Sequence, residues 1–561
     1  MRRFFVGALL FMAVALVPFQ ASSAASKKAL RAPMATIEGK VTALGTPLAG
    51  VLVSDGRDFA TTDTKGRYSL VSDKAFRVVF VVTPNGYVPT SKDGLQPDFW
   101  QLLTQPADRV EQHDFTLLPE DQTTYGIMFI TDEHLCNAMP QKPDLRLFDS
   151  LAVPALDKVR TLLAPKGPVY TFNLGDLSHD RYWYSQNFRI DAAYGHLLEC
   201  GVKGPMYSIN GNHDHDPAIY CADPSRTEFE SQHLYRRTLG PAWYSMNIGG
   251  DHWIMMNNMQ YINHPGTARR YKGVVGDRNY GGYYSPDQIE WLEKDLALVP
   301  EGTRIYMCSH APMFDPRRYR HPKDQVALID SLVASRGSVM EFFAGHVHRM
   351  ENTFRPECPH IRMHALPATS GNMWECWPVG TIVGLDGTPG GVEWGLCSGG
   401  NVERHYMTYG GKEQRMRVYD MNSVRAWYAS EPDVRKIFDI IPPEYDYASR
   451  LYENGILVNY WWLNPGDRVE IYENGRLLPS IRLEKDADPI ALVNHMFFRL
   501  DEYAGQKKNP VNMELTMTKL FYARAEAADS GIKVVVRDID GNIVCEEQLQ
   551  RGKTFSPACT D

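Results

Sequence analysis

Apolar and polar residues alternate along the chain between residues 35 and 118. The runs ATIEGKV (Ala35–Val41) and RVVFVV (Arg77–Val82) are two of several short apolar or alternating segments that Gly, Asp and Asn separate. A period of two is typical of half-buried strands, and the small polar residues mark the turns between them. For residues 35–119 we predict a small antiparallel β-sandwich.

The pattern changes after about residue 120, where short apolar runs end in polar clusters and alternate with segments of helical periodicity. In SPDQIEWLEKDLALV, Ser285 is a credible helix start. Ile289, Leu292 and Leu296 then fall on one helix face. Strands that alternate with amphipathic helices predict a layered α/β domain, which we place at residues 120–380.

The last third of the chain returns to strands and turns. Gly-rich turns such as YENGRLL and DIDGNIV separate apolar strands such as GILVNYWWL and KVVVRDID. We predict a second β-sandwich at residues 381–558. The expected fold class is therefore α/β, with two additional all-β sandwich domains.

The first 24 residues have the layout of a secretory signal peptide. Two arginines precede an apolar stretch from Phe4 to Phe19, and the small residues Ser22–Ala24 follow as a cleavage site. The apolar stretch is short and contains Pro18, which disfavours a membrane anchor. No cysteine follows it for lipid attachment, and nothing later is long and apolar enough to span a bilayer. We expect a periplasmic or secreted protein.

The net charge bears on which partners the chain can bind, and the cysteine content bears on its disulfides. Loss of residues 1–24 removes two arginines and no acid, which takes the formal net charge from −8 to −10. Because affinity for nucleic acid depends on cationic contacts to phosphate, a polynucleotide partner is disfavoured. Export permits disulfides, but the nine cysteines are an odd number. Cys545 and Cys559 enclose a loop of about fifteen residues that a disulfide could close.

Five clusters of carboxylate, imidazole and amide side chains each follow an apolar run of the α/β domain. Each cluster alone could be a turn or a satisfied polar core residue, but together they offer more donors than one ion needs. Such donors suit Mn, Fe or Zn, and two ions can hold a bridging hydroxide for in-line attack on a phosphoryl group. The clusters are Thr131–His134, Gly175–Asp180, Gly211–Asp214, Ser309–His310 and Gly345–His348.

The motifs D-x-H, G-D-x-x-x-D, G-N-H-D, a separate H and G-H-x-H, within about residues 125–370, resemble those of calcineurin-like metallophosphoesterases. The resemblance implies a layered β-sandwich core with flanking helices, and hydrolysis of phosphate esters with two divalent metal ions. The flanking prealbumin-like and C-terminal sandwich modules are similar to an exported bacterial group of this superfamily. Carried over by motif, one metal would be bound by Asp132, His134 and His348, the other by Asn212, His310 and His346, with Asp176 bridging.

The same resemblance implies that His213 is not a ligand and that it stabilises or protonates the leaving oxygen. Three residues after the bridging carboxylate, purple acid phosphatases carry a metal-binding Tyr, whereas this chain has His179 followed by Asp180. The charge-transfer iron site of those enzymes is therefore not expected, and a His at this position resembles nuclease-like members. Either residue could partner His213. We favour Asp180, because a carboxylate fixes an imidazole tautomer.

The sequence leaves the roles of several residues near the motifs open. Arg181 could hold a phosphate oxygen or make a surface ion pair, and Trp374 could wall the pocket or pack between domains. The basic run Arg317–His321 could contact an anionic substrate or form a solvated loop. We expect a phosphate monoester or diester of a small molecule, glycan or lipid head group. The alternatives are a nuclease-like phosphodiesterase, and a binding protein with a degenerate site, which the complete donor set disfavours.

Overall fold

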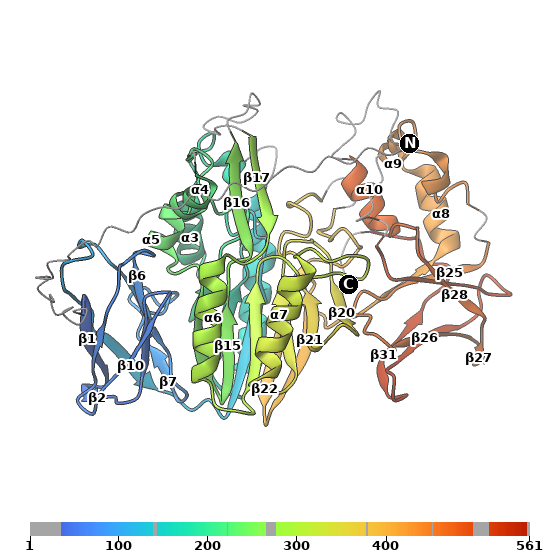
Figure 1. The fold of residues 1–561 in the computed structure, drawn as a ribbon. Coiled ribbons are helices and arrows are strands. Elements are labelled where there is room, and N and C mark those ends of the chain that lie inside the picture. The colour runs from blue at the N-terminus through green and yellow to red at the C-terminus, as the bar shows by residue number, and fades with distance from the viewer. Residues whose placement is uncertain are drawn as a thin grey trace, which may run out of the picture. The chain divides into compact units, whose positions relative to one another are not determined.

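The computed structural model shows three modules in chain order, which we call the N-terminal, core and C-terminal modules (Figure 1). None of the helices in the described part of the chain is long and apolar enough to cross a membrane. The predicted signal peptide lies outside the described residues. These comprise residues 35–138, 143–221, 223–264, 277–376, 380–450, 453–497, 515 and 517–557.

The N-terminal module, residues 35–119, consists of two small sheets. Burial alternates along its first strand, with Ile37 and Val41 fully buried, as the period of two predicts. One sheet has the order β2-β1-β10-β7, with β5 and β9 also paired to β1, and the other has the order β4-β3-β6-β8. The strands are β1 (Ile37–Ala43), β2 (Thr46–Pro47), β3 (Leu52–Ser54), β4 (Phe59–Thr61), β5 (Arg67–Leu70), β6 (Val78–Val82), β7 (Tyr87–Pro89), β8 (Trp100–Leu102), β9 (Glu111–Gln112) and β10 (Phe115–Pro119).

The core module begins with a sheet of order β13-β12-β11-β22-β23. β11, β12 and β13 run parallel, and β22 pairs antiparallel with β11 along six residues, from Thr124 to Phe129. The sheet therefore extends past the domain boundary that we placed at residue 380, and the core module spans residues 124–408. Its strands are β11 (Thr124–Ile130), β12 (Val169–Asn173), β13 (Met206–Ser208), β22 (Gly391–Ser398) and β23 (Asn401–Thr408).

A second core sheet has the order β14-β15-β18-β19-β21-β20. Strands β15, β18, β19 and β21 run parallel to one another, whereas β14 and β20 pair antiparallel at the two ends of the order. A separate two-stranded sheet, β16-β17, follows β15 along the chain. The strands are β14 (Tyr244–Ile248), β15 (Asp251–Met255), β16 (Met259–His264), β17 (Asp277–Gly282), β18 (Arg304–Ser309), β19 (Met340–Ala344), β20 (Glu351–Arg355) and β21 (Cys358–Ala365).

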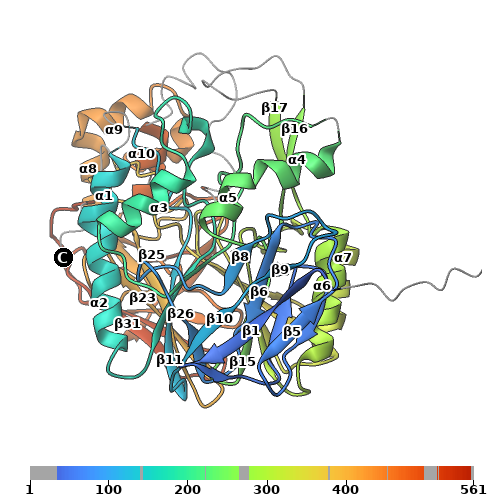
Figure 2. The same ribbon diagram turned by 90° about the vertical axis from the view of Figure 1, so that its left-hand side faces the viewer.

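The two core sheets pack face to face through buried aromatic residues. Phe129 of the first sheet stacks on Phe343 of the second at a centroid distance of 4.7 Å, and Phe172 meets Trp253 at 5.0 Å. Helices α2 and α3 lie on one side of this sandwich and α6 and α7 on the other (Figure 2). The helices are α1 (Asp144–Leu147), α2 (Val153–Leu163), α3 (Ile190–Glu199), α4 (Pro224–Ser231), α5 (His233–Thr238), α6 (Pro286–Leu298) and α7 (Lys323–Ala334).

The predicted fold class is confirmed, and so is the predicted helix after Ser285. The Ser285 side chain accepts a hydrogen bond from the backbone N–H of Gln288 at 3.4 Å, which caps α6. Leu292 and Leu296 are buried on its inner face. The layered core thus places the carboxyl ends of its parallel strands at one edge, where ligands bind in α/β sheets.

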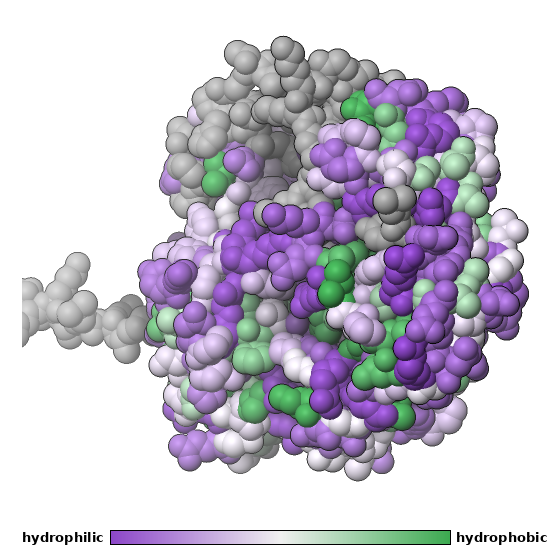
Figure 3. Space-filling model, turned by 90° about the vertical axis from the view of Figure 1, so that its right-hand side faces the viewer, coloured by the Kyte–Doolittle hydropathy of each residue, from purple (hydrophilic) through white to green (hydrophobic). Residues whose placement is uncertain are grey.

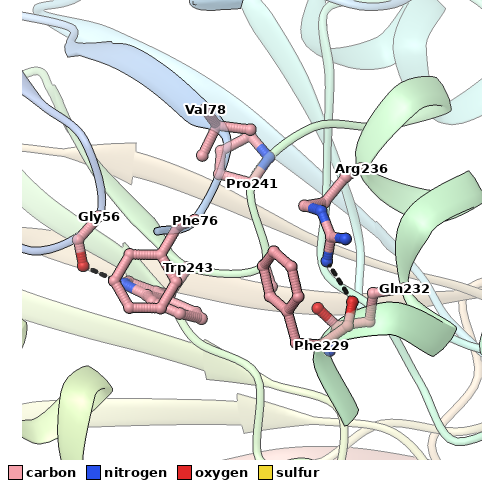
Figure 4. A pocket seen from close by; sticks show the side chains of 9 residues that line it. Gly56, Phe76, Val78, Phe229, Gln232, Arg236, Pro241 and Trp243 are labelled. Atoms are coloured by element: carbon pink, nitrogen blue, oxygen red, sulfur yellow. Dashed lines mark hydrogen bonds between the residues drawn. The ribbon is translucent and has the colours of Figure 1, made fainter. Parts of the chain in front are cut away.

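The N-terminal module packs directly on the core module. Trp243 donates a hydrogen bond to the Gly56 carbonyl at 2.9 Å, and its ring meets Phe76 edge-on (Figure 4). Next to it, the Arg236 guanidinium lies 3.9 Å from the centre of the Phe229 ring. Aromatic rings and cation–π contacts, among them Arg77 over Phe229 at 5.1 Å, close this junction, and the resulting pocket holds only about 20 Å³.

The C-terminal module, residues 417–557, contains two four-stranded sheets, β24-β25-β29-β28 and β27-β26-β30-β31. It also contains three helices that the strand-and-turn pattern did not predict, α8 (Met421–Ser430), α9 (Pro432–Ile437) and α10 (Pro489–Phe497). The strands are β24 (Arg417–Asp420), β25 (Gly455–Asn459), β26 (Arg468–Glu473), β27 (Arg476–Leu477), β28 (Ser480–Leu483), β29 (Leu520–Arg524), β30 (Ile532–Arg537) and β31 (Ile543–Leu549).

The side of the molecule that carries these strands is mostly hydrophilic, with hydrophobic residues in small separate groups (Figure 3). Cys545 lies on β31 and forms no disulfide with any described residue. Its proposed partner, Cys559, lies outside the described residues. The bridge between them stays a prediction.

Candidate metal centre

Five core strands deliver the predicted ligands to one edge of the sandwich. β11, β12 and β13 are parallel in the first sheet, and β18 and β19 are parallel in the second. The polar clusters that follow these strands converge because the carboxyl ends of parallel strands meet. The structure brings together all seven residues predicted as metal ligands: Asp132, His134, Asp176, Asn212, His310, His346 and His348.

The first group of donors consists of Asp132, His134 and His348, all buried and with ligand atoms within 4.8 Å of one another. His134 Nε2 lies 3.0 Å from His348 Nε2, which in turn lies 3.3 Å from Asp132 Oδ1. Donors that share one divalent metal at about 2.1 Å lie roughly 3.0–3.4 Å apart. The spacing of this group fits one ion.

The second group consists of Asp176, His310 and His346, whose ligand atoms also lie within 4.8 Å of one another. His310 Nε2 lies 3.2 Å from Asp176 Oδ2 and 3.2 Å from Asn212 Oδ1. Asp176 Oδ2 is also 3.9 Å from His134 Nε2 of the first group. This carboxylate therefore faces both groups, as a bridging ligand would.

The carboxylate of Asp132 shows why the groups suit metal ions. Its Oδ2 accepts hydrogen bonds from Thr131 Oγ1 and from the His346 backbone N–H, both at 2.8 Å. Its Oδ1 is buried and makes no hydrogen bond, although imidazole nitrogens surround it at 3.3–3.9 Å. A buried carboxylate oxygen without a partner is costly, and a cation at this position would satisfy it. The donor set fits two divalent ions.

The histidines of the site have pKa values that move in opposite directions. Burial would lower the pKa of His310, but Asp176 and Asp132 raise it to about 9. Burial lowers the pKa of His346 well below its ordinary value, and His310 adds to this effect. Only neutral imidazole binds a metal, so ions that enter the site would displace the His310 proton. Metal affinity should therefore increase with pH.

Five of the seven predicted ligands have left-handed backbone conformations, with φ between 47° and 68°. Non-glycine residues rarely adopt this region, and each instance costs of the order of 1–3 kcal/mol. The surrounding structure must impose the conformation, and in doing so it aims the side chains at common points. The five residues are Asp132, His134, Asp176, His346 and His348.

Two glycines of the motifs are required for close approach of the loops. A Cβ atom at Gly211 would lie 2.1 Å from Asp176 Oδ1. A Cβ atom at Gly345 would lie 1.9 Å from Thr131 Oγ1. Neither gap admits a side chain, so the glycines of G-N-H-D and G-H-x-H allow neighbouring loops to touch.

His213 lies beside the metal groups, and 7% of its surface is exposed. Its Nδ1 is 2.7 Å from Asp180 Oδ1, which is the pairing that the sequence favoured. His179 Nδ1 lies 3.6 Å from the same oxygen, and its ring centre is 4.3 Å from that of His213. The structure therefore places Asp180 as the partner of His213, with His179 alongside both.

Neither of the two predicted substrate contacts lines the cavity at the metal groups. Arg181 is exposed and is not among the residues that line this cavity. Trp374 is 1% exposed, donates a hydrogen bond to the Glu133 carbonyl at 2.7 Å and packs edge-on against Phe148. Trp374 is therefore buried inside the core module, neither in the pocket wall nor between domains, and its hydrogen bond holds the loop that carries Asp132 and His134.

Second-layer contacts hold the ligand imidazoles, and the sequence did not reveal them. His348 Nδ1 lies 3.2 Å from Asn372 Oδ1, and His310 Nδ1 lies 2.8 Å from the Leu174 carbonyl. Such partners fix the tautomer and leave Nε2 as the donor for the metal. Asn372 lies two residues before Trp374 and outside the five clusters that the sequence identified.

Asp214, the last residue of G-N-H-D, is a structural link that the motif alone did not identify. Its carboxylate accepts backbone N–H bonds from Asp176 at 2.7 Å, Gly211 at 2.9 Å and Ser178 at 3.0 Å. Burial, with the Asp176 charge, raises the pKa of Asp214 to about 6. Asp214 thereby ties together two loops that carry ligands.

We expect Asp214→Ala to lower the free energy of unfolding by roughly 3 kcal/mol or more, since an unsatisfied buried N–H costs about 1–3 kcal/mol and three would lose their acceptor. Asp214→Asn retains one oxygen and should lose less. Urea unfolding of metal-free protein would measure both. A change below about 1 kcal/mol for the alanine variant would contradict the linking role.

A cavity of about 350 Å³ opens at the two metal groups. Three arginines line it together with five of the seven predicted ligands and His213: Arg318, Arg320 and Arg349. Arg318 and Arg320 belong to the basic run that the sequence left as either an anion contact or a solvated loop. The structure places both at the cavity.

Family models match most of the chain. Residues 125–350 match the family described as calcineurin-like phosphoesterase. Residues 35–120 match the N terminal of calcineurin-like phosphoesterase, and residues 364–543 match the C terminal of calcineurin-like phosphoesterase. The matches follow one another in the order of the three modules of the fold, and the C-terminal match begins at residue 364, inside the core module.

Individual relatives are distant. The chain is 26% identical over 179 residues to a 3′,5′-cyclic adenosine monophosphate phosphodiesterase of Escherichia coli (strain K12), covering 31% of this chain and 52% of that protein. It is 25% identical over 161 residues to Purple acid phosphatase 15 of Arabidopsis thaliana, covering 27% of this chain and 26% of that protein. The chain thus spans about half of the first relative and a quarter of the second.

Among solved structures, a dimetal phosphatase from Danio rerio is similar with a TM-score of 0.30 and 14% identity. The similarity covers 52% of this chain and all of that chain.

Proposed function

The chain belongs to the calcineurin-like phosphoesterase family, and we propose that it is a dinuclear-metal hydrolase of phosphate esters. The substrate would be a phosphodiester or phosphomonoester of a small molecule, glycan or lipid head group. The observation that carries this proposal is the pair of donor groups that face a common carboxylate, Asp176.

In this proposal Asp132, His134 and His348 hold one ion and Asn212, His310 and His346 hold the other, with Asp176 shared. Divalent ions of the Mn, Fe or Zn type, when bound, polarise phosphoryl oxygens and lower the pKa of water. The protein orients these donors through the left-handed backbone and the second-layer partners described above. No protein nucleophile is required.

His213 would move the proton at the leaving oxygen. Asp180 Oδ1 lies 2.7 Å from Nδ1 of this histidine, and the carboxylate supports the imidazolium form. A positioned histidine of this kind typically contributes about 10²–10⁴-fold to the rate. Asp180 acts through His213 and is therefore a positioning residue.

A nuclease-like phosphodiesterase is the second candidate, and the position of His179 next to His213 favours it. An additional imidazole near the leaving group suits diesters. The acidic chain nevertheless disfavours a polynucleotide as the diester.

We also propose export to the periplasm or medium, on the basis of residues 1–24 alone. A mature protein whose mass corresponds to cleavage near Ala24 would support this. Retention of the full N-terminus in an otherwise active protein would contradict it.

Metal removal tests the proposed function. We expect a chelator to reduce hydrolysis of an aryl phosphate ester at least about a hundredfold, and Mn²⁺ or a similar ion to restore it, because the metals rather than a side chain supply the chemistry. Metal analysis beside the rate assay would follow both. Full activity without bound metal, or a stable phosphoenzyme, would rule the proposal out.

A further inference from the structure

Helix α10 of the C-terminal module carries two polar residues within an apolar sequence. In its sequence, PIALVNHMF, only Asn494 and His495 have polar side chains, and both are fully buried. A buried polar group is costly unless a hydrogen bond replaces its contacts with water. The hydrogen-bond partners of these two side chains should therefore explain why the helix contains them.

Both side chains reach the core module. Asn494 Nδ2 donates a hydrogen bond to the Glu375 carbonyl at 2.7 Å. His495 Nε2 lies 3.0 Å from the Gly384 carbonyl, and His495 Nδ1 lies 3.1 Å from Asn372 Nδ2. The two polar residues of α10 thus contact the segment that follows the last metal motif.

The partners of His495 fix its tautomer. Asn372 Nδ2 also donates to Glu375 Oε2 at 2.8 Å, and a carboxylate oxygen can only accept, so the amide of Asn372 presents its nitrogen to His495. His495 Nδ1 is therefore an acceptor. The proton is on Nε2, which donates to the Gly384 carbonyl. Two acceptors thus hold the amide nitrogen of Asn372, and its oxygen must point the other way.

The amide oxygen of Asn372 faces a metal ligand. It lies 3.2 Å from His348 Nδ1 and accepts a hydrogen bond from it. The proton on Nδ1 leaves His348 Nε2 with its lone pair inside the first donor group, 3.3 Å from Asp132 Oδ1. Partners of this kind orient a metal-binding imidazole, and losing them typically weakens metal affinity about 10–100-fold. Two consecutive hydrogen bonds therefore connect α10 to a predicted metal ligand.

The loop that contains Gly384 supports the same ligand from its backbone side. The Leu385 N–H donates to the His348 carbonyl at 2.8 Å. Asn459 of β25 holds this loop as well, because its Nδ2 donates to the Asp386 carbonyl at 2.7 Å. The C-terminal module thus contacts both segments that hold His348.

The second donor group is held from within the core module. His310 Nδ1 lies 2.8 Å from the Leu174 carbonyl, which is part of the loop that leads to Asp176. This contact fixes the His310 tautomer without any residue of the C-terminal module. The two metals should therefore differ in how strongly they depend on that module.

We propose that His495 is a positioning residue for the first metal, and that the C-terminal module thereby completes the metal centre of the core module. His495 belongs to neither donor group and acts through Asn372 on His348. This inference rests on the proposed function, because it concerns the metal that Asp132, His134 and His348 would bind.

His495→Leu and His495→Asn are a matched pair that tests the proposal. The two side chains have the same shape and both lose the bond to Gly384, but only Asn can place an acceptor oxygen opposite Asn372 Nδ2. In His495→Leu, one of two Mn²⁺ ions should bind about tenfold or more weakly and the other at wild-type affinity. His495→Asn should recover most of the lost affinity. Calorimetric titration of the metal-free full-length proteins with Mn²⁺ would measure both ions.

Two further measurements separate positioning from folding damage. Urea unfolding of the metal-free variants should show similar losses of stability, because both lack the donor for the Gly384 carbonyl. Excess Mn²⁺ should return hydrolysis of an aryl phosphate ester by His495→Leu to the wild-type rate, since every predicted ligand is retained. A residue that acts on the substrate would not be rescued in this way.

Wild-type affinity for both ions in His495→Leu would overturn the inference. So would an equal loss of affinity in the two variants, because the Gly384 contact rather than the orientation of Asn372 would then hold the ligand. A wild-type protein that binds two ions but hydrolyses no phosphate ester would contradict the proposed function alone. A wild-type protein that binds no Mn²⁺ would contradict both.

Discussion

Asp176→Asn is expected to abolish hydrolysis, with kcat/KM reduced by at least about 10⁴-fold, the scale seen when groups that act as a unit are removed. The carboxylate faces both donor groups, at 3.2 Å from His310 Nε2 and 3.9 Å from His134 Nε2. A neutral amide offers one weak oxygen donor and cannot neutralise two cations. Both metals should therefore bind more weakly at once.

The same substitution should not destabilise the metal-free protein. Burial raises the pKa of Asp176 even though His310 acts to lower it, which means that the charged form of Asp176 is costly when no metal is bound. Without metal, the variant should thus unfold at the wild-type temperature or above it. Added Mn²⁺ should raise its unfolding temperature much less than that of the wild type. A ligand that binds only the folded state raises stability by mass action. A small thermal shift with Mn²⁺ would therefore indicate that the variant binds the metal weakly.

Asp439→Asn, at an exposed position of the C-terminal module, is a control for the same chemical change. It should match the wild type in rate, metal content and thermal shift. Two metals bound to the Asp176→Asn protein at wild-type affinity would disprove the bridging role.

His213→Ala is expected to lower kcat by about 10²–10⁴-fold while the metals stay bound, because the histidine would act on a proton and not as a ligand. Its side chain lines the cavity and is fixed by Asp180 at 2.7 Å. The loss should be larger for esters with poor leaving groups, which depend most on protonation. Metal analysis of the purified variant, beside rates on two aryl phosphates of different leaving-group pKa, would check both points.

Asp180→Asn should cause a smaller fall in kcat and should shift the alkaline limb of the pH–rate profile to lower pH, since an amide no longer supports the imidazolium. A purely structural role for Asp180 would leave that limb in place. Loss of metal from the His213→Ala protein would contradict its assignment as a non-ligand. That outcome would favour a site built on the cluster of His134, His179 and His213.

The candidate ligands could be predicted from the sequence because each motif is local. A glycine, a short loop and a donor at a strand end suffice to identify the position, and parallel strands then bring the five loops together. The φ angles of Asp132 and Asp176 show that the loops need special backbone geometry. The glycines in the motifs mark the positions where neighbouring loops of the chain approach each other closely.

The rest of the site depends on contacts between distant segments. Trp374 is aromatic and follows the last motif, which made it a plausible part of the pocket wall. Its burial depends instead on Phe148, which directly follows α1 in a distant part of the sequence. Arg349 adjoins a ligand in sequence, yet its burial and its pairing with Asp315 follow from tertiary packing. Periodicity and motif spacing carry no information on either.

The position of β22 and β23 constrains how this protein can evolve by recombination. These strands lie between the last metal motif and the C-terminal module, yet β22 covers the edge of β11, the strand that leads into Asp132. A chimera joined at residue 380 would leave β11 as an open edge, prone to pair with other chains, unless the incoming segment supplied a matching strand. Breakpoints that preserve the site should therefore fall after Thr408. The phosphoesterase motifs are inherited together with a part of the chain that contains none of them.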